Sequence, residues 1–170
     1  VCPPVTFHIR QGERIFLDGR NGSGKSSLLK LLAGEDISHT GIITRSSGLV
    51  ISYVPQDTGW LRGSLSSFAA ENHLDESIFK AILRKMDFER VQFEKDMSEF
   101  SEGQKKKVLI AKSLSEKAHI YVWDEPLNFI DVYSRMQIEN LIARFSPAMV
   151  LAEHDRYFCE AIEAEIISLD

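Results

Sequence analysis

The sequence lacks several features that would place it in a specialised class of protein. Only two of its 170 residues are cysteines, Cys2 and Cys159, which is too few for a disulfide framework or a cysteine metal site. No apolar run approaches the ~20 residues that a helix needs to cross a bilayer. The first residues have neither the basic nor the apolar pattern of a secretion signal. A reducing, cytoplasmic environment without membrane insertion is therefore expected.

An excess of positive charge is also missing. Lys and Arg number 20 against 25 Asp and Glu, and the formal net charge of −5 excludes a uniformly basic nucleic-acid coat, although not a local basic patch. With 44% hydrophobic and 26% charged residues, the composition is that of an ordinary globular protein. The length suits one domain with a single core over residues 1–170.

Apolar periodicity switches repeatedly between strand and helix along the chain. Short strands are expected at 5–9, 14–17, 41–44, 49–54, 119–123, 149–152 and 166–169, and helices at 26–33, 101–114, 132–145 and 156–161. This alternation predicts an α/β domain with a mostly parallel sheet. The helical stretch at about 60–115 interrupts the alternation and predicts an inserted subdomain.

A glycine-rich turn between the strand at 14–17 and the helix at 26–33 forms the clearest motif. It reads Gly19, Arg20, Asn21, Gly22, Ser23, Gly24, Lys25, Ser26, and it fits the phosphate-loop pattern G-x-x-x-x-G-K-[ST]. The glycines let backbone N–H groups turn inward, and the following helix directs its positive end at phosphates. Lys25 would contact the β- and γ-phosphates of ATP, Ser26 would ligate Mg²⁺, and Ser27 is a further nucleotide-binding candidate. The simpler alternative is a glycine-rich turn with an ordinary surface lysine, which the flanking strand and helix disfavour.

Two acids follow an apolar strand later in the chain. Asp124 and Glu125 come directly after Ile120-Tyr121-Val122-Trp123. In open α/β sheets, ligands bind at the carboxyl ends of the strands. Asp124 would hold Mg²⁺ through water, and Glu125 would polarise the attacking water. Without the glycine-rich loop, Asp124 and Glu125 would equally be interpreted as the solvated, acidic end of a strand.

Phe100-Ser101-Glu102-Gly103-Gln104 lies shortly before these acids. It resembles the signature of ATP-binding-cassette (ABC) domains, whose usual form is Leu-Ser-Gly-Gly-Gln. Ser101 and Gln104 also satisfy a helix capping box, a simpler interpretation that is compatible with function. In the ABC family this helix end closes on the γ-phosphate bound by a partner domain. The resemblance therefore implies that Ser101, Gly103 and Gln104 bind the partner's nucleotide.

Other elements follow in the order of the same family. Gln56 matches the glutamine that senses Mg²⁺ and the attacking water, and His154 matches the switch histidine that touches the γ-phosphate. Residues 126–131 match the loop that crosses between paired domains, which makes Asp131 a nucleotide-binding candidate. The resemblance implies a P-loop NTPase fold of the ABC type, with a mostly parallel sheet core, a small antiparallel β part and a short helical subdomain.

Within the ABC superfamily, the sequence resembles the ABC-F branch. The stretches FSEGQKKKVLIAKSL, WDEPLNFIDVYSRMQIE and AEHD are similar to the second cassette of ABC-F proteins that protect ribosomes from lincosamides, streptogramin A and pleuromutilins. The insert at 57–99 is also shorter than expected for a transporter. The resemblance implies a second cassette, intramolecular or homodimeric, and a ribosome as partners. The ATP-binding subunit of a membrane ABC transporter and a degenerate cassette that holds ATP as a structural clamp are the alternatives.

The chain also departs from the family pattern. Glu102 stands where the signature usually has glycine, and Phe129-Ile130 replace the commoner residues of the crossing loop. Both changes are expected to slow hydrolysis. The aromatic residue that stacks on adenine is expected upstream of Val1, and residues 105–107, three lysines, are expected on a solvated helix face. In the family, the phosphate cradle and the signature of one cassette bind two different nucleotides, so a complete site needs two cassettes. An isolated copy of this chain is therefore expected to be a poor ATPase.

Overall fold

The computed structural model describes residues 4–169, which form two compact units. The first unit comprises the described residues within Val1–Tyr53, Ala118–Glu125 and Ile142–Asp170. The second comprises Val54–Lys117 and Pro126–Leu141. Cys159 is buried as a free thiol in the first unit, and Cys2 lies outside the described residues.

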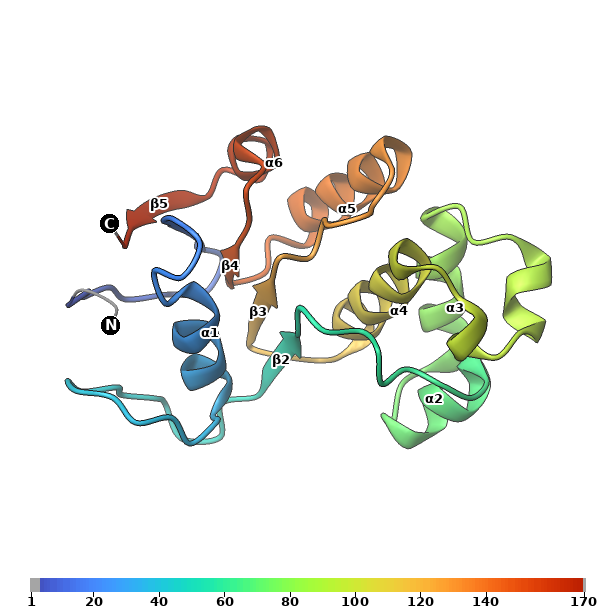
Figure 1. Ribbon diagram of the computed structural model, residues 1–170, viewed down its shortest axis with the longest axis horizontal. Helices are drawn as coiled ribbons and strands as arrows, with labels where there is room; N and C mark the ends of the chain where they lie inside the picture. Colours follow the sequence, from blue (N-terminus) through green and yellow to red (C-terminus); the bar gives the residue numbers. More distant parts are fainter. Residues whose placement is uncertain (1–3, 170) are drawn as a thin grey trace. The chain divides into compact units, whose positions relative to one another are not determined.

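The first unit is built on a five-stranded sheet with the order β2-β3-β4-β1-β5. Figure 1 labels four of these strands, β2, β3, β4 and β5. The strands are β1 (Arg14–Asp18), β2 (Ile51–Val54), β3 (Ile120–Asp124), β4 (Met149–Ala152) and β5 (Glu165–Ser168). β1 pairs in parallel with β4 and β5, and β3 pairs in parallel with β4. Parallel neighbours require crossover connections, which explains why strands adjacent in the sheet are distant in sequence. The predicted α/β architecture with a parallel sheet is confirmed.

The core of the first unit forms because its central strands are continuously apolar. All four residues of β4 are buried, as expected for a strand covered on both faces. Helix α1 (Lys25–Ala33) packs against β3 and β4 and ends at Gly34, whose left-handed φ of 102° suits a helix C-terminus. One cluster of this core consists of Ile15, Leu17, Leu29, Val122, Val150, Ala152 and Leu169. Helix α6 (Arg156–Ala161) begins at Asp155, whose side chain accepts a hydrogen bond from the backbone N–H of Phe158.

Two segments predicted as strands are not strands, and they do not supply the expected antiparallel β part. Residues 5–9 alternate as predicted, with Val5, Phe7 and Ile9 against the core of the first unit, but they join no ladder. Residues 41–44 are irregular, and Ile42 is 94% exposed. Alternation correctly identifies which side chains of 5–9 face the core. A strand also needs a neighbouring backbone to bond with, which periodicity alone cannot reveal.

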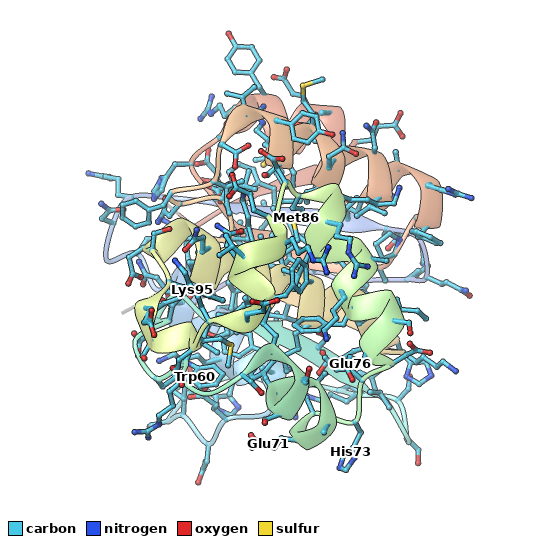
Figure 2. All side chains as sticks on the ribbon, turned by 90° about the vertical axis from the view of Figure 1, so that its right-hand side faces the viewer. Trp60, Glu71, His73, Glu76, Met86 and Lys95 are labelled. Carbon is cyan, nitrogen blue, oxygen red and sulfur yellow. The ribbon has the colours of Figure 1, made fainter. Side chains whose placement is uncertain are left out.

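The second unit is helical. It contains α2 (Leu65–Glu71), α3 (Glu76–Lys85), the 3₁₀ turns η1 (Arg90–Glu94) and η2 (Met97–Glu99), α4 (Glu102–Ser115) and most of α5 (Val132–Phe145). Figure 2 labels Glu76, the first residue of α3, and Met86, the residue directly after this helix. Aromatic rings fill the interior, with centroids 6.1 Å apart for Phe68 and Phe79 and 5.4 Å apart for Phe88 and Phe100. Within residues 4–169, none of the helices has both the length and the apolar character required of a membrane span.

Candidate functional site

The carboxyl ends of β1, β3 and β4 meet at one edge of the sheet in the first unit. Ala152 of β4 is the register partner of both Leu17 of β1 and Asp124 of β3. Since these strands are parallel, the segments that follow them leave the sheet at the same edge. Those segments are the glycine-rich loop, Glu125 and the residues up to His154. The acids therefore lie on the same edge of the sheet as Lys25.

The glycine-rich loop folds tightly around the Lys25 side chain. Gly22 and Gly24 have φ values of 84° and 100°, which a residue with a side chain adopts only with strain. The Lys25 ammonium is buried and donates hydrogen bonds to the carbonyl oxygens of Gly19 and, at 3.1 Å, Arg20. A Cβ at Gly19 would lie only 2.6 Å from Oγ of Ser23. A side chain at position 19 would therefore crowd Ser23 inside the loop.

Ser23 points to an anionic ligand for this cradle. Its Oγ is buried and has no hydrogen-bond partner within the described residues. An unsatisfied buried polar group costs about 1–3 kcal/mol, and a phosphate oxygen would accept the hydroxyl proton. Asn21 and Ser27, by contrast, are exposed. The residues of the loop thus fit a phosphate group.

Ser26 and Asp124 form a hydroxyl–carboxylate pair beside the cradle. The Ser26 hydroxyl donates to Oδ1 of Asp124 at 3.1 Å, and Asp124 is 1% exposed. Hard oxygen donors of this kind suit Mg²⁺, which usually takes few protein ligands and keeps waters and phosphate oxygens. Residues 4–169 contain no cluster of three or more His, Cys, Asp or Glu side chains that would hold a metal without a nucleotide. The donor set therefore fits Mg²⁺ bound together with phosphates.

Glu125 and His154 are in contact at the same edge. Nε2 of His154 lies 3.4 Å from Oε1 of Glu125, and the backbone N–H of Glu125 donates to the Ala152 carbonyl oxygen at 2.9 Å. The φ of Glu125 is 46°, in the left-handed region that costs a non-glycine residue on the order of 1 kcal/mol or more. Such strain is typical of residues whose side chains are held in position for chemistry.

Tyr53 was not identified by the sequence patterns. It lies on β2, the neighbour of β3 in the sheet, and its hydroxyl is buried without a partner within residues 4–169. Burial, and then the negative charges of Asp124 and Glu35, raise the pKa of the Tyr53 phenol. The phenol is therefore a neutral donor beside the buried carboxylate. Its place on the strand beside β3 follows only from the strand order.

The second unit contains the predicted signature. The Ser101 hydroxyl accepts the backbone N–H of Gln104 at 3.2 Å, and the Gln104 side chain accepts the backbone N–H of Ser101 at 3.0 Å. The predicted capping box is confirmed. A Cβ added at Gly103 would collide with the carbonyl oxygen of Phe129, so this glycine also has a packing role. The start of α4 therefore lies directly against the loop at 126–131.

Asp131, on that loop, is held by α4. Its carboxylate lies 2.7 Å from Nζ of Lys107 and accepts hydrogen bonds from the backbone N–H and the hydroxyl of Ser134, both at 2.8 Å. Burial opposes ionisation of the Asp131 carboxyl. Lys107 and Ser134 outweigh it and hold the pKa well below its usual range. Asp131 is therefore a fixed anion.

The prediction of a solvated lysine face at 105–107 is wrong. Lys106 and Lys107 are only 2% and 9% exposed. Lys107 pairs with Asp131, and Nζ of Lys106 donates to the carbonyl oxygen of Pro55 at 3.1 Å. From the sequence alone, a run of three lysines is interpreted as a solvated helix face. The groups that pair with Lys106 and Lys107 are far away in sequence, so the sequence does not reveal them. Gln56, next to Pro55, is exposed and belongs to this second unit.

The candidate residues are thus divided between the units. The first unit holds the cradle with Asp124, Glu125 and His154, and the second holds Gln56, Ser101, Gly103, Gln104 and Asp131. The parallel sheet with its glycine cradle and edge acids is that of a P-loop NTPase. The sequence profile of the family described as ABC transporter matches residues 2–128. The chain belongs to this family, and it is an ATP-binding ATPase domain.

Known relatives of the chain are named for different roles. The ribosome protection protein VmlR of Bacillus subtilis (strain 168) is 29% identical over 162 residues, covering 92% of this chain and 29% of VmlR. The zinc import ATP-binding protein ZnuC of Ehrlichia ruminantium (strain Gardel) is 28% identical over 182 residues, covering 100% of this chain and 74% of ZnuC. A solved ATP-binding subunit of an ABC transporter superposes with a TM-score of 0.82 at 22% identity, covering 99% of this chain and 79% of that one, and shares its fold. The chain spans about a third of the length of the first curated relatives that it matches, which are covered to 33%, 28% and 29%.

Proposed function

We propose that this chain is one cassette of an ABC-F protein that binds and hydrolyses Mg-ATP together with a second cassette and acts on the ribosome. The observation that carries the ATPase mechanism is the shared register of Leu17, Ala152 and Asp124, since it brings cradle and acids to one sheet edge. The similarity to VmlR supports the ribosomal role. The residues of the signature region support the ABC-F branch.

In this proposal, different residues of the first unit bind the phosphates, hold the metal and activate the attacking water. The backbone N–H groups of the loop and the Lys25 ammonium hold the β- and γ-phosphates. Ser26 and Asp124 would hold Mg²⁺ beside these phosphates. The bound metal supplies charge neutralisation at the phosphate oxygens. Glu125 accepts the proton of the attacking water, and His154 steadies the γ-phosphate.

The second unit serves the nucleotide of the partner cassette. The Ser101 oxygen already accepts the Gln104 N–H, so the Ser101 hydroxyl proton remains to donate to a phosphate oxygen. The N-terminus of α4 adds its positive end. Gly103 lets the backbone approach closely, and Asp131 fixes the crossing loop beside it. The partner is a second cassette of the same chain or of a homodimer.

In the whole protein, ATP favours the closed pair of cassettes, and this state binds the ribosome. Hydrolysis then releases the protein from the ribosome, because ATP favours the closed pair of cassettes and the hydrolysis products do not. We place the protein in the cytoplasm, where it protects ribosomes from antibiotics of the lincosamide, streptogramin A and pleuromutilin type.

The decisive experiment uses Glu125→Gln in the full-length protein. The variant should bind ATP, lose turnover and cosediment with ribosomes in the presence of Mg-ATP, because the closed state forms but does not resolve. Glu71→Gln, an exposed change on α2, is the matched control and should behave as the wild type. Full turnover by Glu125→Gln would contradict the role of Glu125 as the base.

The ATP-binding subunit of a membrane transporter is the second candidate function. The similarity to ZnuC over the whole chain favours it. Fractionation of cells separates the two: the ATP-trapped variant should be found with ribosomes in the first case and with membranes in the second.

A further inference from the structure

Glu153 is a buried acid at the sheet edge of the first unit, and the proposed mechanism gives it no task. It follows β4 directly and is 4% exposed. Its Oε1 accepts a hydrogen bond from the backbone N–H of His154 at 2.8 Å. A carboxyl group away from water is costly unless hydrogen bonds compensate it. The side chain of Glu153 is therefore bonded to the main chain of the proposed switch histidine.

This bond fixes the direction in which the chain leaves β4. It closes a ring through the Glu153 side chain and the peptide that joins Glu153 to His154, so the ring contains the Cα–C bond of Glu153. Rotation about that bond, the ψ torsion, decides where residue 154 points. The constraint matters because the His154 side chain is 52% exposed, so packing restrains the imidazole only weakly. The backbone of His154 is held instead.

The residues on either side of Glu153 both contact Glu125. The Ala152 carbonyl oxygen accepts the backbone N–H of Glu125 at 2.9 Å, and Nε2 of His154 lies 3.4 Å from Oε1 of Glu125. Ala152 is fixed by its place in the sheet. A change of ψ at Glu153 would therefore move the imidazole away from the Glu125 carboxylate without disturbing the strand. All of these residues belong to the first unit.

The chain after His154 is also anchored, but through more distant or weaker contacts. The Asp155 side chain accepts the backbone N–H of Phe158 at the start of α6. Arg156 lies 3.0 Å from Asp18, yet its side chain is 70% exposed, and exposed ion pairs contribute little to stability. The bond from Glu153, by contrast, comes from a buried side chain and acts on the peptide of His154 itself.

We propose that Glu153 is a positioning residue for ATP hydrolysis, whose carboxyl oxygen holds the His154 peptide so that the imidazole stays beside Glu125. This inference rests on the proposed role of His154 at the γ-phosphate. The role requires the acceptor oxygen of Glu153 and not its negative charge. A side chain of similar length without an acceptor therefore leaves the histidine in place for only part of the time.

Hydrogen exchange on the full-length protein tests the bond itself, independently of turnover. The amide of His154 is protected while a side-chain oxygen holds it. Glu153→Met has nearly the length of glutamate but no acceptor, and it should raise exchange at this amide about fivefold, the factor that one ordinary hydrogen bond represents. Glu153→Gln keeps an acceptor oxygen and should retain the protection. Glu160→Met, an exposed change on α6, is the matched control.

Steady-state turnover of the same full-length variants tests the consequence for hydrolysis. Glu153→Met should lower kcat about fivefold, because the histidine is in place in a correspondingly smaller fraction of the molecules. KM should be unchanged, since the glycine-rich loop is untouched. Glu153→Gln and Glu160→Met should keep the kcat of the wild type. In a His154→Ala background, Glu153→Met should cause no further loss, because both changes remove the same contribution.

Three results would overturn the proposal. The first is unchanged exchange in Glu153→Met, and the second is an equal loss in Glu153→Gln and Glu153→Met. The third is a further loss of turnover in the His154→Ala background, which general damage to the fold would also give. Failure of the proposed function looks different: His154→Ala would then turn over ATP as fast as the wild type. Glu153 would have no catalytic group to position, while the exchange result would still show whether its bond exists.

Discussion

The backbone of Gly103 lies against the carbonyl oxygen of Phe129 so closely that a side-chain carbon at position 103 would collide with it. Phe129 itself has a left-handed φ of 65° and is exposed. The signature and the crossing loop of this chain are therefore in direct contact. Packing alone therefore requires glycine at position 103, apart from the anion recognition that we propose for it.

Gly103→Ala should destabilise the second unit by about 1–3 kcal/mol, the usual cost of overpacking. The carbonyl of Phe129 is backbone and cannot rotate away as a side chain would. Denaturant unfolding measures the loss. Gly59→Ala, in the same unit, is the control, because its Cβ would meet only a side-chain atom that can move, Oδ1 of Asp57, at 3.3 Å. Equal stability of wild type and Gly103→Ala would contradict the collision.

Asp124→Asn should weaken Mg-ATP binding by about 10- to 100-fold, as expected for a group that orients the surroundings of a metal. Binding of ATP in EDTA should be unchanged or stronger, because one buried negative charge near the phosphates is removed. Titration calorimetry with and without Mg²⁺ separates these effects. Equal weakening in both conditions would indicate a damaged fold and not a metal role.

The contribution of Asp131 to stability should depend on pH. Its pKa is lowered in the folded state, so protons bind first to the unfolded chain as the pH falls. The stabilisation is complete at neutral pH and declines below about pH 4, the ordinary range of an Asp carboxyl. Unfolding at several pH values should show the difference between wild type and Asp131→Asn shrinking toward acid. A difference that stays constant would mean that packing, and not charge, dominates at Asp131.

Tyr53→Phe should raise the free energy of unfolding of the nucleotide-free protein by roughly 1 kcal/mol, because it removes a buried hydroxyl without a partner. Tyr157→Phe, whose ring is 78% exposed, should change nothing. Thermal unfolding in the absence of nucleotide compares the two. A loss of stability in Tyr53→Phe would show that the hydroxyl has a bonding partner in solution.

Much of the sheet edge was predictable because its determinants are local. The phosphate loop, the acids after β3 and the bounds of α5 at Val132–Phe145 follow from spacing, periodicity and the breaker Pro147. The buried lysines and the bond between Thr58 and Glu102 were not predictable. Their partners are brought close only by folding, since Thr58 and Glu102 are 44 residues apart. The strand predicted at residues 41–44 is wrong for a related reason, because no sequence pattern shows whether a segment has a neighbouring strand to pair with.

The left-handed backbone at Glu125 implies a conflict between thermal stability and the proposed ATPase activity. Glycine would relax that position, so Glu125→Gly should tolerate heat as well as the wild type or better while losing the carboxylate. A library selected for heat resistance alone would therefore be drawn toward glycine at this codon. In the proposed mechanism that change removes the base, so keeping an acid there would require selection for turnover itself.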